Sequence, residues 1–281
     1  MLHEVLLNHK PRSLKGDHAW LGEALAIKDP TAAVFRPQSG ANLLIVGQND
    51  ESALAIMATA LVSLAAQQQS RRRNASPSFY IFDSTPQDAA PSQFWSKVAG
   101  TAPEHVRLVQ RGELPATLVE IAAEIERRQK THEASETPIF LFIYGLQRFR
   151  ELRKAEDDFG FSRRGEEAVA NPAKQFATIV REGPGVGIHT VIWCDTLNNV
   201  QRALERQGLR DFEMRVLFQM SPSDSSNLID SPAAGKLGLY RALFYSEEKG
   251  QPEKFRPYGL PDDAWLDWVK EQLQGKRALA V

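Results

Sequence analysis

Short apolar runs recur along this chain and are separated by polar or helix-forming segments. The runs that predict β-strands are residues 43–46, 78–83, 105–109, 138–143, 188–195, 212–220 and 241–246. Ile139–Ile143 shows no polar alternation, which is typical of a strand covered on both faces. The pattern therefore predicts an α/β fold, in which helices cover both faces of a mostly parallel central sheet.

The segments between these runs carry helical periodicity. In Leu114–Lys130 the apolar residues share one face of a predicted helix, and further helices are predicted at residues 93–99, 173–181, 224–230 and 261–274. Near the N-terminus, Trp20–Ile27 predicts a short hairpin or edge strand that ends at Asp29-Pro30. The strongly charged segment Leu146–Asn171 is predicted to be a solvated loop, and a loop that faces a partner is the alternative.

The stretch Asn42–Ala66 is the most informative part of the sequence. An apolar run, Leu43–Val46, breaks at Gly47 and a few polar residues, and an Ala- and Leu-rich segment then begins. This pattern predicts a strand, a tight turn and a helix. The uncharged part of the helix, Ser52–Ala66, is shorter than the roughly 20 residues that cross a bilayer. The helix is therefore predicted to be buried within the protein.

A strand, a tight turn and a helix are also the elements of a phosphate-binding loop. The pattern G-x-x-x-x-G-K-[ST] uses glycines to bring backbone N–H groups to the phosphates, a lysine as countercharge and a hydroxyl for Mg²⁺. Counted from Gly47, the positions of the second glycine, the lysine and the hydroxyl are occupied by Ser52, Ala53 and Leu54. If the loop is one residue or more shorter, Glu51-Ser52 stands at the Lys-Ser position and only the hydroxyl remains. The lysine is absent in either case.

Acidic residues replace the lysine. Asp50 and Glu51 stand at the expected helix N-terminus, where a carboxylate caps free N–H groups and repels an incoming phosphate. We therefore interpret this segment as a vestigial phosphate loop, and an ordinary turn with a polar helix cap is the alternative. The residues of the segment are Gly47, Gln48, Asn49, Asp50, Glu51 and Ser52.

Composition limits the classes of protein that fit. The chain has 281 residues, of which 42% are hydrophobic and 25% charged, as in ordinary soluble globular proteins. The net charge of −1 does not attract nucleic acid, so DNA binding would need a local basic patch. The one cysteine, Cys194, lies in an apolar run, which predicts a buried thiol and no internal disulfide.

Domain organisation and compartment follow from the same features. Residues 1–16 are predicted to be a polar lead-in without fixed structure, and residues 17–281 to form a single domain. The expected location is cytoplasmic, without membrane contact by this domain, although a longer parent chain could be membrane-associated.

Two motifs in the second half of the chain resemble the RecA-like motor domain of the FtsK/SpoIIIE family of translocases. Gly187–Ile192 is similar to a strand of that family that begins G-I-H. Arg215–Phe218, followed by Asp224–Gly238, is similar to the family segment R-i-a-F and then D-S-r-x-i-L-D-x-x-G-A-e-x-L-l-G. The resemblance runs from Trp20 to about Tyr245 and implies a RecA-like three-layer sandwich. It identifies four structural motif residues: Arg215, Asp224, Ser225 and Asp230.

The departures from this family fall on its chemistry. One family strand ends in Asp-Glu, which hold Mg²⁺ and orient the attacking water. The corresponding strand here continues as Tyr144-Gly145-Leu146. The family's Thr-Gln sensor of the terminal phosphate corresponds to Asp195-Thr196. With the lysine absent as well, the comparison implies no catalytic residue, no metal site, and weak or absent binding of ATP and Mg²⁺.

Three functions are compatible with this resemblance. The first is a pseudo-ATPase module of a longer multi-domain motor that translocates DNA or protein, with a regulatory or partner-binding role, similar to the degenerate modules of type VII secretion motors. The second is an active ATP-dependent DNA translocase with an atypical phosphate loop. The third is a nucleotide-free adaptor or scaffold.

The partners implied by the first function are other RecA-like modules of the same or a longer chain, with a ring as one arrangement. A peptide or protein segment bound at the vacated pocket is a further implied partner. Arg181 lies where the family has a basic residue near the subunit face. It would either act in trans on a neighbour's nucleotide or form a surface ion pair with Glu182.

Overall fold

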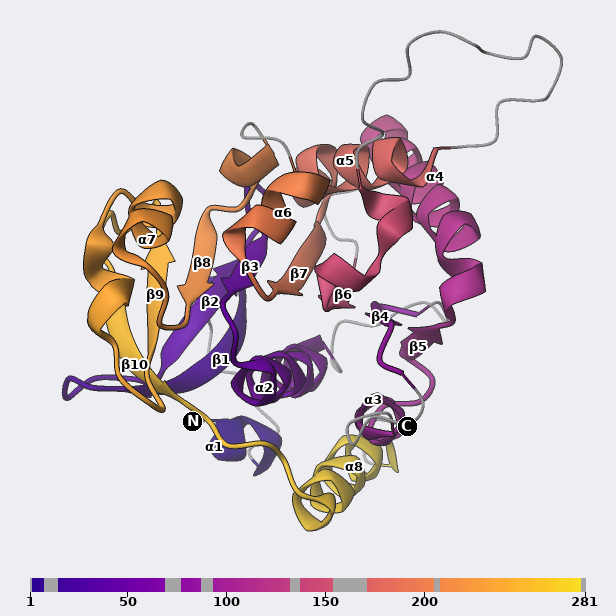
Figure 1. Cartoon of the computed structure of the whole chain (residues 1–281). Coiled ribbons are helices and arrows are strands. Elements are labelled where there is room, and N and C mark those ends of the chain that lie inside the picture. Colours follow the sequence, from indigo (N-terminus) through magenta and orange to yellow (C-terminus); the bar gives the residue numbers. More distant parts are fainter. Residues whose placement is uncertain are drawn as a thin grey trace, which may run out of the picture.

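Within the described residues, ten strands form one β-sheet (Figure 1). The computed structural model describes residues 2–7, 15–68, 77–86, 93–131, 137–153, 171–204 and 208–278. The strands are β1 (Asp17–Ala24), β2 (Thr31–Phe35), β3 (Leu43–Val46), β4 (Phe79–Asp83), β5 (Val106–Val109), β6 (Ile139–Tyr144), β7 (Ile188–Cys194), β8 (Met214–Leu217), β9 (Ala242–Ser246) and β10 (Glu253–Pro257). Their order across the sheet is β2-β1-β10-β9-β8-β3-β7-β6-β4-β5.

The strands from β8 through β3, β7, β6 and β4 to β5 run parallel to one another. Strands β9, β10, β1 and β2 extend this sheet through antiparallel pairings. β3, β6 and β7 are buried along their whole length, as expected for parallel strands between two helical layers. The prediction of an α/β sandwich around a mostly parallel sheet is confirmed.

Helices form a layer on each face of the sheet (Figure 1). The helices are α1 (Leu2–Leu7), α2 (Asp50–Gln68), α3 (Phe94–Ala99), α4 (Leu114–Thr131), α5 (Pro172–Glu182), α6 (Leu197–Ala203), α7 (Pro222–Ile229) and α8 (Asp263–Ala278). One hydrophobic core joins α1, α2, α3 and α8 to one face of the sheet. A second core joins α4, α5, α6 and α7 to the other face.

α2 is the central helix of its layer. Every residue from Ala53 to Gln68 is buried, because the helix packs in one core with the sheet and with α1, α3 and α8, and lies against β1. This confirms the prediction of a buried helix for Ser52–Ala66. None of the described helices combines the length and the apolar character needed to span a bilayer.

The N-terminal region differs from its prediction. Residues 2–7 form α1 rather than an unstructured lead-in, because Leu6 is fully buried against the core under α2. Residues 8–14 lie outside the described part of the chain. The domain boundary at residue 17 stays a prediction.

Several elements were not predicted from the sequence pattern. β2, β10 and α6 were missed, and β1 begins and ends three residues before the predicted segment Trp20–Ile27. β2 alternates buried and partly exposed positions, but its residues do not alternate apolar and polar types, and β10 buries only Phe255. Each strand is stabilised by its neighbours in the sheet.

The charged segment Leu146–Asn171 also differs in its first part. Leu146–Arg148 and Arg150–Leu152 are short 3-10 helices, and Leu146, Phe149 and Leu152 are buried in the core that faces α5. The three apolar side chains recur every third residue, which matches the period of a 3-10 helix. Residues 154–170 lie outside the described part, so the loop prediction is untested there.

His189 in β7 is a buried core residue. The centroid of its ring lies 5.2 Å from the ring centroid of Phe35 and 5.4 Å from that of Phe140. Its Nδ1 donates to the carbonyl oxygen of Ala41 at 2.7 Å. Burial lowers the pKa of His189 to about 4. The imidazole is therefore neutral in the folded protein at pH 7.

We expect the stability of the protein to fall as the pH is lowered from about 7.5 to 5. The unfolded chain binds a proton at His189 near pH 6.5, but the folded chain does so only near pH 4. This linkage removes about 2 kcal/mol of unfolding free energy over that interval. Urea titrations across the pH range should give a shallower dependence for His189→Phe than for the parent. Identical slopes would contradict the assignment, while His18, whose pKa burial also lowers, leaves a residual slope in both proteins.

Candidate functional site

Three residues, Gly47 to Asn49, join β3 to α2. Gly47 has a φ of +132°, and a Cβ there would lie 2.8 Å from Cβ of Phe218. Its N–H donates to the carbonyl oxygen of Cys194 at 3.1 Å. Only glycine fits this position. The connection is also shorter than the loop of the phosphate-binding pattern, in which four residues separate the two glycines and a lysine follows.

Asn49 caps α2. Its Oδ1 accepts from the N–H of Ser52 at 3.0 Å, and its carbonyl oxygen accepts from the N–H of Ala53 at 3.0 Å. Asp50 and Glu51 lie in the first turn, as expected, and Oδ1 of Asp50 accepts from the N–H of Glu51 at 3.1 Å, while the N-cap residue itself is Asn49. Both are exposed, as is Gln48, and the acids face the positive end of the helix dipole.

Two aromatic side chains fill the space at the ends of β6 and β7, on the α2 face of the sheet. Tyr144 and Trp193 are neighbours in the strand register, and their rings stack at 4.7 Å between centroids. Nε1 of Trp193 donates to the carbonyl oxygen of Gly47 at 3.1 Å, so the loop is tied to the stack. Trp95 packs edge-on against Tyr144, and burial raises the pKa of Tyr144 to about 12. The phenol is therefore neutral.

Arg148 covers this stack from the loop that follows β6. Its guanidinium carbon lies 5.5 Å from the ring centre of Tyr144 and 6.0 Å from that of Trp193, within cation–π range. Its Nη1 donates to Oγ1 of Thr85 at 3.1 Å, and Thr85 donates to a carboxylate oxygen of Asp83 at the end of β4. The arginine is thus held by residues of its own chain.

The residues around the loop do not fit a magnesium-bound nucleoside triphosphate. A phosphate site needs inward N–H groups and a mobile cation at the helix N-terminus. Here the Gly47 carbonyl faces Trp193, two carboxylates occupy the first helical turn, and Arg148 is engaged with Thr85 and the rings. At the end of β6, where the family carries its Mg²⁺-binding pair, the buried Tyr144 offers no carboxylate.

The sequence pattern singled out Tyr144 only because it stands where the FtsK/SpoIIIE family has a carboxylate. It did not identify Trp193 or Arg148 as site residues. A signal was present, because one predicted strand ends in an apolar run plus Tyr and another in Trp-Cys. Adjacent strands in a parallel sheet place such residues side by side. That signal becomes usable only once the two strands are known to be neighbours.

Residues after β7 have capping roles. Oγ1 of Thr196 accepts from the N–H of Asn199 at 3.3 Å, and Asp195 accepts from Nδ2 of Asn199 at 2.8 Å, so both stabilise the start of α6. Cys194 is buried, as predicted, and burial raises the pKa of its thiol to about 12. A neutral thiol is a poor nucleophile.

Arg181 lies far along the sheet from the loop at Gly47. The carbonyl oxygen of its neighbour Val180 accepts from Nδ2 of Asn42, which directly precedes β3, whereas Gly47 follows that strand. The Arg181 side chain is exposed and pairs with Glu182 at 2.9 Å. The structure therefore does not bring Arg181 to the loop of its own chain.

The four family-motif residues surround α7. Arg215 in β8 donates to the carbonyl oxygens of Leu228 and Leu209 and to a carboxylate oxygen of Glu247. Ser225 is fully buried and links the turn after α7 to the helix. Asp230 ends α7 with a φ of +53°, and Asp224 lies in its first turn. These contacts are structural.

Solved structures are similar to this chain, although no family model and no curated protein sequence matches it. The conjugation coupling protein TcpA of pCW3, in its monomer form with ATPγS, superposes with a TM-score of 0.64 at 13% identity over 94% of this chain and 71% of TcpA. EssC (ATPases 2 and 3) of Geobacillus thermodenitrificans superposes with a TM-score of 0.61 at 14% identity. The match covers 96% of this chain and 51% of the EssC chain. EccC (ATPases 2 and 3) of Thermomonospora curvata, in complex with a signal sequence peptide, superposes with a TM-score of 0.59 at 16% identity. The match covers 93% of this chain and 47% of the EccC chain.

These likenesses establish the fold. The chain has the same fold as TcpA and as the ATPase domains of EssC and EccC, which agrees with the resemblance to FtsK/SpoIIIE motor domains. The chain spans about half the length of the EssC and EccC structures that it matches.

Proposed function

We propose that this chain is a pseudo-ATPase module of a multi-domain translocating motor, which does not hydrolyse ATP itself and has a regulatory or partner-binding role. The observation that carries the proposal is the hydrogen bond from Nε1 of Trp193 to the carbonyl oxygen of Gly47. This bond occupies a carbonyl group of the loop, and the stacked indole ring fills the space at the end of β7. In a working site this space receives phosphate and metal.

Electrostatics support the same conclusion. Transfer of a phosphoryl group requires stabilisation of several negative charges, chiefly by a metal and a lysine. Asp50 and Glu51 stand at the helix N-terminus where such charges would bind. Their exposure weakens the repulsion through solvent screening, so the missing lysine and the filled space are the larger effects.

The expected partners are neighbouring modules of the same fold. In EssC and EccC the matched segment is about half of a chain that contains ATPases 2 and 3. A partner segment in a vacated pocket fits less well than predicted, because Tyr144 and Trp193 are 1% and 3% exposed and fill that end of the sheet themselves. We therefore place a partner-binding role on the surface of the module.

Isothermal titration with Mg-ATP is expected to show no binding with a dissociation constant below about 1 mM, which corresponds to roughly −4 kcal/mol. The TcpA domain, whose structure contains ATPγS, is the positive control. A micromolar dissociation constant or measurable turnover would favour the active-translocase alternative and overturn the proposal.

The variant Asp50→Asn/Glu51→Gln separates charge from shape. Both amides keep the first helical turn and remove two negative charges, while Trp193 still contacts Gly47. We expect this variant to show no binding of Mg-ATP in the same titration, because the short connection between β3 and α2 and the stack of Tyr144 and Trp193 are unchanged. Micromolar binding by the variant would show that charge alone excludes the nucleotide.

A further inference from the structure

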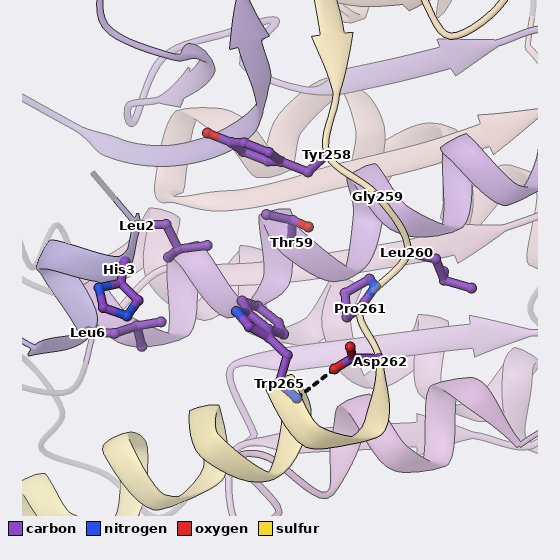
Figure 2. Close-up of a pocket in the computed structure, with 10 residues that line it drawn as sticks. All are labelled: Leu2, His3, Leu6, Thr59, Tyr258, Gly259, Leu260, Pro261, Asp262 and Trp265. Carbon is purple, nitrogen blue, oxygen red and sulfur yellow. Dashed lines mark hydrogen bonds between the residues drawn. The ribbon is translucent and has the colours of Figure 1, made fainter.

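A cavity lies on the α2 face of the sheet (Figure 2), and none of the residues that line it belongs to the loop at Gly47. Its volume is about 420 Å³, and its walls come from α1, α2, the segment after β10 and the start of α8. The walls are mostly aliphatic or aromatic: Leu2, Leu6, Tyr258, Leu260, Pro261 and Trp265. This size and lining are those of a small-molecule site.

Thr59 supplies a polar group inside this cavity. It belongs to the buried helix α2 and is only 4% exposed. Its hydroxyl forms no hydrogen bond with any described residue, whereas the hydroxyl of Ser63, one turn later, donates to the Thr59 carbonyl oxygen at 2.6 Å. Figure 2 shows the Thr59 hydroxyl among the surrounding wall residues. The hydroxyl lines the cavity and has no partner among the described residues, so it is available to a ligand or to water.

Asp262 supplies an anionic group at the rim. One of its carboxylate oxygens caps α8 by accepting from the N–H of Trp265 at 2.8 Å, as Figure 2 shows. Asp262 forms no ion pair within the described residues, while the neighbouring Asp263 is neutralised by Lys97. Its second carboxylate oxygen has no partner among the described residues, and Asp262 and Trp265 both line the cavity.

The side chains at the rim favour a positively charged ligand. A carboxylate next to an aromatic face attracts an ammonium group through charge-assisted hydrogen bonding and cation–π attraction. His3, the other ionisable side chain on the wall besides Tyr258, stacks on Trp268 at 4.8 Å between ring centroids. Its ring is therefore packed against α8.

We propose that this cavity is a binding site for a small amine with an apolar ring, in which the ammonium group pairs with Asp262 and a polar group at the other end hydrogen-bonds to Thr59. The site is separate from the filled loop region. The proposal stands whether or not the chain binds nucleotide.

Three probes test this chemistry: tyramine, phenethylamine, which lacks the hydroxyl, and 4-hydroxyphenylacetate, which carries the opposite charge. In NMR titrations at low ionic strength we expect tyramine to bind about threefold to tenfold more tightly than phenethylamine. It should bind at least about fivefold more tightly than the acid. The indole N–H signal of Trp265, identified by its loss in Trp265→Phe, should shift on binding.

Two variants give the matched controls. Thr59→Val keeps the side-chain shape and should abolish the preference for tyramine over phenethylamine. Asp262→Asn retains a helix cap, since Asn caps as well as Asp, and should remove most of the preference for amine over acid. Thermal unfolding of both variants verifies the fold. Equal binding of the three probes, unchanged preferences in both variants, or no shift at Trp265 would overturn the proposal.

Discussion

Replacing Trp193 with alanine is expected to lower the free energy of unfolding by about 3–5 kcal/mol, the usual cost of truncating a buried aromatic residue. The ring is 3% exposed, stacks on Tyr144 and donates to the Gly47 carbonyl oxygen. The loss combines burial, stacking and an unpaired carbonyl in the tight turn. Urea denaturation at pH 7.5 measures it directly.

Trp193→Phe is the matched control. It keeps an aromatic ring against Tyr144 and removes only the indole N–H and part of the volume, so the expected loss is about 1–2 kcal/mol. Equal losses for Ala and Phe would mean that the hydrogen bond to Gly47 dominates. A loss below about 1 kcal/mol for Trp193→Ala would mean that the stack does not hold this end of the sheet together, and the proposed self-filled site would fail.

Replacing Arg215 with methionine is expected to cost about 2–4 kcal/mol of unfolding free energy. The side chain is 10% exposed and makes three hydrogen bonds, to Leu228, Leu209 and Glu247. Methionine retains much of the apolar packing but leaves the buried carbonyl oxygen of Leu228 and the partly buried one of Leu209 without this donor. Glu247 can be solvated, since 43% of its side chain is exposed, and so adds less to the loss.

Arg181→Met is the control for Arg215→Met, because it makes the same chemical change at an exposed ion pair. Its expected cost is below about 0.5 kcal/mol, since surface ion pairs contribute little. Similar costs for the two variants in urea titrations would show that Arg215 does not brace α7 and β8. The structural role given to the family motif would then be wrong.

Local patterns in the sequence were sufficient for most of the parallel sheet. The uninterrupted apolar run that became β6 indicated coverage on both faces, and the Ala- and Leu-rich segment after Gly47 indicated a buried helix. Such patterns are reliable because burial on both faces requires apolar residues at every position. The edge strand β2 and the internal antiparallel strand β10 were missed, since each depends on pairing with neighbouring strands, which for β10 include β1 at the other end of the chain.

The features of the candidate site also fall into those that the sequence predicts and those that only the structure shows. The absence of a lysine and the presence of Asp50 and Glu51 can be read directly from the chain. The helix cap at Asn49 and the three-residue length of the turn needed the backbone. Arg148 could not be placed, because its position over two rings depends on the turn at Gly145, whose φ is +81°.

By itself, the sequence determined the α/β sandwich and the residue types after Gly47, where two acids stand and no lysine does, because residue type and apolar period are local properties. Only the tertiary structure decided which side chains fill the space at the ends of β6 and β7. Tyr144 and Trp193 are 49 positions apart in the chain and meet because β6 and β7 pair in register. A stack across neighbouring strands, and its bond to Gly47, is a property of strand order, which no local pattern contains.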